Sequence, residues 1–101
     1  MTPQAYIRAV RQLYIQLPHT SGCFSRSDRQ LAADLFRRQL PLETVRSAML
    51  LAIARRLYRN GPPLGPIRSL HYFVPVLDEI LRQPLPLDYV KYLEHKIATF
   101  N

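Results

Sequence analysis

Seven consecutive apolar residues, AMLLAIA at positions 48–54, form the longest apolar run of the chain. They lie within the segment 42–59, which reads as one helix ended by Asn60 and Gly61. A helix that is apolar on nearly all sides has to be covered on several sides by other elements. We therefore expect this helix to be central in the fold and to contact at least three others. The run is far too short to cross a bilayer.

The rest of the chain also shows helical spacing of its apolar residues, with steps of three and four. Alternating patterns of useful length and glycine-containing hairpin signals are missing, so strands are not expected. A chain of 101 residues is sufficient for one domain with one core. We predict an all-α, compact bundle of five helices, at residues 3–17, 27–39, 42–59, 67–82 and 87–99.

Capping residues and prolines set these boundaries. Thr2 is the expected N-cap of the first helix, with Pro3 in its first turn. Ser27, followed by Gln30, predicts a capping box at the start of the second helix. Pro66 can open the fourth helix. Pro75 lies inside that helix, so we expect a kink or a short break near residues 71–74.

The positive charge is large and concentrated in the middle of the chain. The net charge is +7, and residues 26–68 alone carry nine arginines against three acids. Such a field attracts polyanions, and arginine suits bidentate phosphate contact. A GC-rich genome could account for the preference of arginine over lysine, but not for the concentration in one block. The charge therefore favours nucleic acid as a partner.

Catalytic and metal-binding patterns are missing from the sequence. His19 and Cys23 lie four apart in a Ser/Gly loop, without the further ligands that zinc needs. The acids are scattered, and several occupy the first turns of predicted helices. We expect no enzyme activity, no metal and no cofactor. A single cysteine and an N-terminus without a secretory pattern favour a cytoplasmic location.

The stretch 55–81 carries the candidate binding residues. Three arginines end the central helix, a Pro/Gly loop follows, and a fourth arginine begins the next helix, with aromatic residues among them. Arginines interleaved with aromatic rings suit single-stranded nucleic acid. Favourable interaction with the helix dipole would explain some of these arginines, and core packing would explain at least one of Tyr72 and Phe73. The expected phosphate-contacting and stacking residues are Arg55, Arg56, Arg59, Arg68, Tyr58 and Tyr72.

The second and third predicted helices have helix-turn-helix dimensions. Their apolar faces leave little of the third helix free to enter a DNA groove, which argues against major-groove reading. Contact with the nucleic-acid backbone fits better. We expect a secondary phosphate-contacting patch at Arg37, Arg38 and Arg46.

The segment 40–82 contains LPLETVRSAMLLAIARR, a loop, and IRSLHYFVPVLDEIL. In this order it resembles the helical C-terminal domain of DnaD-type bacterial replication and primosome proteins. The resemblance implies binding of DNA, preferably single-stranded, within a multiprotein assembly. Pro75 departs from the family pattern, and the aromatic residue that usually follows the last helix is missing. The matching positions are Val45, Ala48, Ala52, Ser69, Leu70, Tyr72, Phe73, Val76, Ile80 and Leu81.

These patterns favour a small basic nucleic-acid-binding protein, acting on single-stranded DNA or RNA within a replication or mobile-element assembly. The alternative is a non-catalytic structural subunit or adaptor of an RNA-guided effector or transposition complex, which would bind mainly a protein partner. A membrane-surface protein is disfavoured, because it would need a helix with separate basic and apolar faces.

Overall fold

The computed structural model describes residues 1–100 and contains no strand among them. It confirms the predicted all-α class and the number of α-helices. A short 3-10 turn, η1, precedes the fourth helix. The elements are α1 (Pro3–Ile15), α2 (Arg26–Arg37), α3 (Leu42–Leu57), η1 (Leu70–Phe73), α4 (Val74–Arg82) and α5 (Leu87–Ala98).

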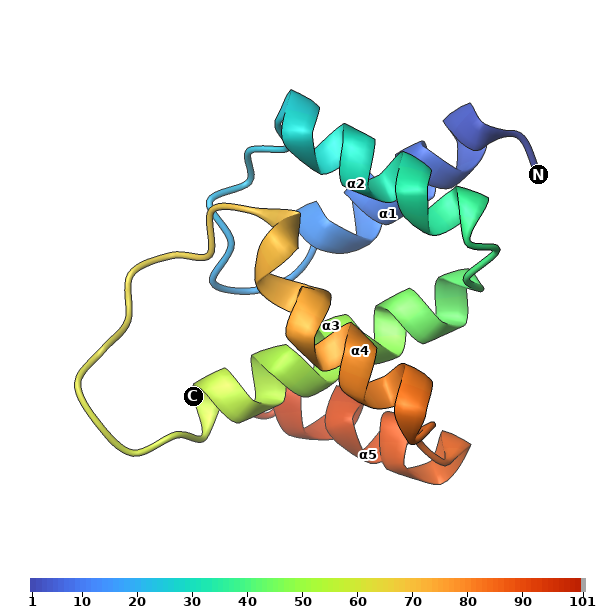
Figure 1. Ribbon diagram of the computed structural model, residues 1–101. Coiled ribbons are helices and arrows are strands. Elements are labelled where there is room, and N and C mark those ends of the chain that lie inside the picture. Colours follow the sequence, from blue (N-terminus) through green and yellow to red (C-terminus); the bar gives the residue numbers. More distant parts are fainter. Residues whose placement is uncertain (101) are drawn as a thin grey trace.

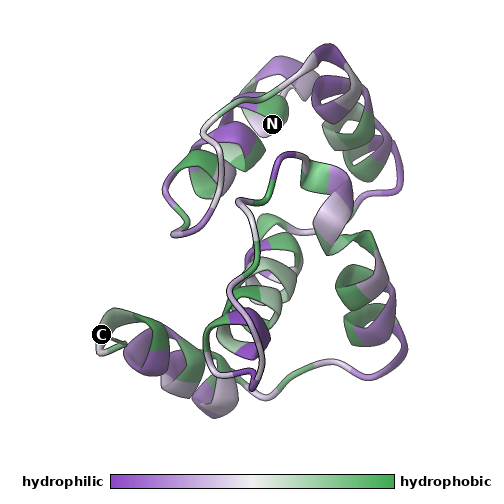
Figure 2. Cartoon of the chain, turned by 90° about the vertical axis from the view of Figure 1, so that its left-hand side faces the viewer, coloured by the Kyte–Doolittle hydropathy of each residue, from purple (hydrophilic) through white to green (hydrophobic). Residues whose placement is uncertain are grey.

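Helix α3 runs through the middle of the molecule (Figure 1) and contacts α1, η1, α4 and α5. Every residue from Ala48 to Ala54 is buried. Figure 2, coloured by hydropathy, shows α3 predominantly in the hydrophobic colour. The expectation that the apolar run makes this helix central is confirmed.

Helices α1 and α2 lie side by side above α3 (Figure 1). Thr2 caps α1 by accepting a hydrogen bond from the Ala5 amide, and Pro3 occupies the first turn, as expected. Tyr6, Val10 and Tyr14 form the buried stripe of the helix. These residues are four apart in the sequence, so they lie on one face of α1, and this face packs toward α2 and the core.

The predicted cap of α2 is wrong. Ser25, not Ser27, is the N-cap, and its capping-box partner is Asp28 rather than Gln30. The Ser25 hydroxyl accepts from the Asp28 amide at 3.1 Å, and the Asp28 carboxylate accepts from the Ser25 amide at 2.9 Å. A carboxylate accepts an amide hydrogen more strongly than a neutral side chain does. The helix therefore begins at Arg26.

The predicted fourth helix, at 67–82, is also corrected. The chain is extended at Ile67, which forms an isolated bridge with Thr20, and it turns through η1 before α4 begins at Val74. Ile67 is buried, so it contributes to the core as an extended residue. Pro75 then lies in the first turn of α4, where its missing amide costs little. The proline thus marks a break between η1 and α4, one of the two expected outcomes.

The loop between α3 and η1 projects at one side of the molecule in Figure 1 and returns to the loop that follows α1. The Ile67 amide donates to the His19 carbonyl at 2.7 Å, and the Ser21 amide donates to the Ile67 carbonyl at 2.8 Å. The Tyr14 hydroxyl donates to the same Ile67 carbonyl at 3.3 Å. These bonds fix the far end of the loop against the N-terminal third of the chain.

Helix α5 packs against α3 through Val90 and Leu93 and leaves its other face in solvent (Figure 2). None of the helices in residues 1–100 combines the length and hydrophobicity needed to cross a membrane.

Candidate nucleic-acid interface

The arginines at the end of α3 do not point in one direction. Arg56 and Arg59 turn toward the loop that follows the helix. Arg56 donates to the Gly65 carbonyl, and Arg59 donates to the Pro62 carbonyl at 2.6 Å. Both side chains therefore support the loop, and the exposed Arg59 keeps further donors for other acceptors.

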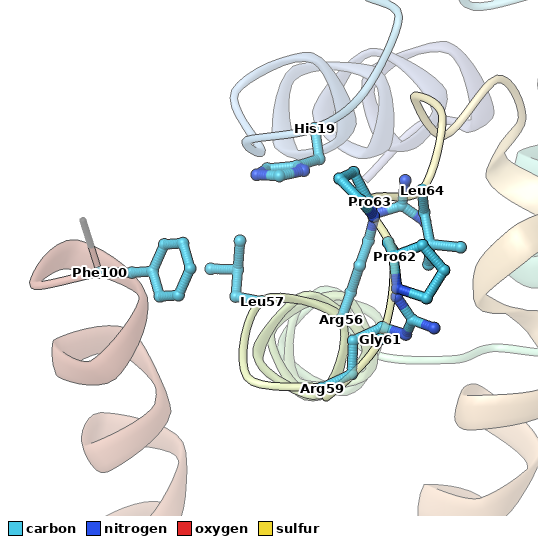
Figure 3. A pocket seen from close by; sticks show the side chains of 9 residues that line it. All are labelled: His19, Arg56, Leu57, Arg59, Gly61, Pro62, Pro63, Leu64 and Phe100. Carbon is cyan, nitrogen blue, oxygen red and sulfur yellow. The ribbon is translucent and has the colours of Figure 1, made fainter.

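Figure 3 shows the pocket that this arrangement creates. Its volume is about 200 Å³, and it lies between the end of α3, the proline-rich loop, the loop after α1 and the end of the chain. The basic lining groups are His19, Arg56 and Arg59, while Leu57 faces the ring of Phe100. Two of the predicted arginines thus share one pocket with a histidine that sequence reasoning did not include.

Tyr72 lies next to Arg56 but is not part of the lining of this pocket. The guanidinium carbon of Arg56 is 5.7 Å from the centroid of the Tyr72 ring, within cation–π range. Tyr72 is 42% exposed, whereas Phe73 is buried and packs edge-on against Tyr14. The expectation that one of the two adjacent aromatic residues belongs to the core is confirmed, and that residue is Phe73.

Arg55 turns away from the loop and toward α4. Its two terminal nitrogens donate to the two carboxylate oxygens of Glu79 at 2.8 and 2.9 Å. This hydrogen bonding lowers the pKa of Glu79 and raises the pKa of Arg55. Arg55 therefore lies on a different face from Arg56 and Arg59.

Arg68 follows the extended residue Ile67 and is exposed, with no ion pair among residues 1–100. The predicted group of four arginines is thus divided by the fold. Arg56 and Arg59 line the loop pocket, Arg55 faces α4, and Arg68 lies at the return of the loop.

The secondary patch is divided as well. Arg37 pairs with Asp34 one turn earlier in α2, and Arg46 pairs with Glu94 of α5 at 2.7 Å. Arg38 is exposed at the end of α2. The three side chains engage different elements of the fold.

A second cluster of aromatic and basic residues lines a groove of about 370 Å³ between α3 and α5. We call it the tyrosine groove, and its polar and aromatic lining consists of Arg55, Tyr58, Tyr89, Tyr92 and Lys96. Sequence reasoning identified only Arg55 and Tyr58. The others lie at spacings of three and four along α5, a helical stripe that was the available signal.

Asp28 is the only fully buried acid among residues 1–100. Its carboxylate accepts from the Ser69 hydroxyl and the Leu70 amide, each at 2.9 Å, and from the Ser25 amide. Burial alone would raise the pKa of Asp28, but the hydrogen bonds from Ser25, Ser69 and Leu70 outweigh burial and lower it. This carboxylate caps α2 and η1 together.

Next to this network, the Ser27 hydroxyl and His71 Nε2 lie 2.9 Å apart at the surface. The Asp28 carboxylate bonds to Ser69 and Leu70 and not to His71. The contacts of Asp28 and of Ser27 therefore join α2 to η1. Within the described part of the chain, no three His, Cys, Asp or Glu side chains are grouped so that they could hold a metal ion.

No known protein family, curated protein or solved structure matches this chain.

Proposed function

We propose that this chain is a small nucleic-acid-binding protein that contacts phosphate groups through arginine side chains and acts within a nucleoprotein assembly in the cytoplasm. The observation that carries the proposal is the large positive charge that the fold leaves unpaired. The chain has a net charge of +7, and only Arg37, Arg46 and Arg55 form ion pairs within residues 1–100. A field of this sign raises association rates with polyanions.

The contacts that arginines already make are compatible with this role. Arg59 donates to a backbone carbonyl through one terminal nitrogen, which leaves other donors for a phosphate. Arg55 is paired with Glu79, but an ion pair at the surface contributes little free energy and exchanges readily. Arg68 and Arg38 are exposed and carry no ion pair within the described chain.

The resemblance of residues 40–82 to DnaD-type replication proteins supports the same class of function. The alternative is a structural subunit that binds mainly a protein partner, with its basic faces near nucleic acid. The two proposals differ in what the isolated chain does, because a subunit of that kind binds nucleic acid weakly without its partner.

We expect the double variant Arg59→Gln/Arg68→Gln to bind nucleic acid with a log–log salt slope smaller by about 1–2, close to one unit for each lost phosphate contact. Fluorescence anisotropy with a labelled oligonucleotide, measured over a series of salt concentrations, gives the slope. Circular dichroism should show an unchanged helical spectrum, because both side chains are exposed.

The matched control is Arg8→Gln/Arg82→Gln, which removes the same charge from exposed positions of α1 and α4. It should change the slope less than the first variant does. Equal slopes for both double variants would contradict localised contacts at Arg59 and Arg68. A wild-type chain that fails to bind nucleic acid even at low salt would overturn the proposed function and favour the structural subunit.

A further inference from the structure

The tyrosine groove exposes three aromatic side chains. Tyr58, Tyr89 and Tyr92 are 46%, 42% and 51% exposed, although all three line the same groove. Helix α5 is anchored to α3 by Val90 and Leu93, which are buried. Tyr89 and Tyr92 are therefore not required to hold α5 in place, and exposed apolar patches can mark binding sites.

The rings of Tyr89 and Tyr92 form a stacked pair. Their centroids are 5.8 Å apart, and their planes differ by 29°. Each ring is attached to the same helix three residues from the other, so both are presented toward one side. Two exposed rings on the same side of the helix offer faces on which a further flat ring can stack.

The opposite wall of the groove is fixed by several contacts. The Tyr58 hydroxyl donates to the Lys96 carbonyl at 2.9 Å, and the Tyr58 ring packs edge-on against Phe100 with centroids 5.1 Å apart. The Lys96 ammonium lies 4.2 Å from the centroid of the Tyr58 ring. This wall is held in position before any ligand arrives, which lowers the entropic cost of binding.

Positive charge lies in the same groove. Lys96 is held over Tyr58, and Arg55, although paired with Glu79, keeps further N–H donors for a phosphate. Both cations line the groove together with the tyrosine pair. A ligand that matches this arrangement has flat aromatic rings joined by negative charges.

We infer that the tyrosine groove binds an unpaired nucleic-acid strand, with bases stacked on Tyr89 and Tyr92 and phosphates next to Arg55 and Lys96. This inference rests on the proposed function and adds the place and the kind of strand. In a duplex the faces of the bases are covered by their neighbours, so a stacking platform selects unpaired strands. Stacking does not read the sugar, so the groove takes DNA and RNA strands alike.

The test compares Tyr89→Leu/Tyr92→Leu with wild type, using labelled oligo(dT), oligo(rU) and a duplex of equal length. Leucine keeps an apolar side chain but removes the ring. We expect the variant to lose about tenfold or more in affinity for both single strands, because base–aromatic stacking contributes strongly to such binding. Its duplex affinity and its salt slope should stay at the wild-type values, because no charge is removed.

Leu81→Ala is the matched control, since Leu81 is 39% exposed, close to the 42% of Tyr89, but lies on α4, outside the groove. It should retain wild-type affinity for single strands. A second readout is tyrosine fluorescence, which stacking should quench in wild type and in the control but less in the groove variant. Lys96→Gln should lower the salt slope on single strands by about one unit.

The outcomes separate the inference from the proposed function. If the Tyr89→Leu/Tyr92→Leu variant binds single strands with wild-type affinity, the tyrosine groove is not the strand-binding site. Phosphate binding by the arginines would remain as proposed. An equal loss of affinity for single strands and for the duplex would also contradict the inference. So would a wild-type chain that self-associates, if the groove variant abolishes the self-association and still binds single strands. A strong preference for only one of oligo(dT) and oligo(rU) would contradict stacking that ignores the sugar. Failure of the wild-type chain to bind any oligonucleotide would remove the proposed function itself.

Discussion

Replacing Asp28 by alanine should lower the free energy of unfolding by about 3–4 kcal/mol, because several donors would lose a charged acceptor at once. The buried carboxylate accepts from the Ser25 amide, the Ser69 hydroxyl and the Leu70 amide. Leu70 is itself buried, so water cannot easily replace the lost acceptor. Urea titration followed by circular dichroism measures the loss.

Asp78→Ala is the control, because Asp78 is exposed on α4. It should change the free energy of unfolding by less than about 0.5 kcal/mol. Similar losses for the two variants would contradict the structural role of Asp28.

The same carboxylate makes stability depend on pH. Its pKa in the folded chain lies below the ordinary aspartate value of about 3.9. The stabilisation by the ionised form is therefore complete above the unfolded-state pKa and is lost as the pH falls through the lower, folded-state pKa. Wild type should lose stability on acidification below about pH 4, and Asp28→Asn should lose less over the same interval. Parallel pH profiles for the two proteins would contradict the lowered pKa.

Truncation of Ile53 to alanine should lower the free energy of unfolding by about 3 kcal/mol, through lost burial and the cavity that remains. Ile53 is fully buried in α3, the helix that contacts α1, η1, α4 and α5. A cavity at this position weakens the packing of several helices together, so little local collapse can compensate for it.

Leu87→Ala provides the comparison for Ile53→Ala, since Leu87 is exposed at the first position of α5. It should alter stability by no more than about 0.5 kcal/mol. If Ile53→Ala were as mild, α3 would not be the centre of the core.

The helical class and the central position of α3 could be predicted because both follow from local composition. The run 48–54 has no polar face, so any fold of this chain has to cover it. The start of α2 was missed for the opposite reason. Ser27 with Gln30 and Ser25 with Asp28 both satisfy the local rule for a capping box. The second pair prevails because Asp28 also reaches Ser69 and Leu70, which are 41 and 42 residues away in the sequence.

The start of the fourth helix depended on distant residues too. Pro66 and Pro75 are each acceptable in a first helical turn. The choice is made by Ile67, whose backbone bonds to the His19 carbonyl and the Ser21 amide keep the chain extended.

For the candidate site, the arginines were visible in the sequence but their directions were not. Arg55 is turned toward Glu79, which is 24 residues away, and so lies apart from Arg56 and Arg59. The stripe of Tyr89, Tyr92 and Lys96 could be seen in the sequence, but the groove that it forms with α3 depends on the packing of the two helices.

Because the bonds at Ile67 and the double cap at Asp28 hold η1 independently of the loop, we expect the covalent connection between α3 and η1 to be dispensable. Residues 61–66 are exposed, while the segments on either side are held by contacts with the rest of the domain. A chain cut within these residues should give two pieces, one with α1, α2 and α3 and the other with η1, α4 and α5. Neither piece can cover its own apolar surface, because α3 in the first is the helix against which α4 and α5 of the second pack. The pieces should find each other and rebuild the domain, which makes this small protein suited to complementation, with reassembly detectable as recovery of helical circular dichroism on mixing.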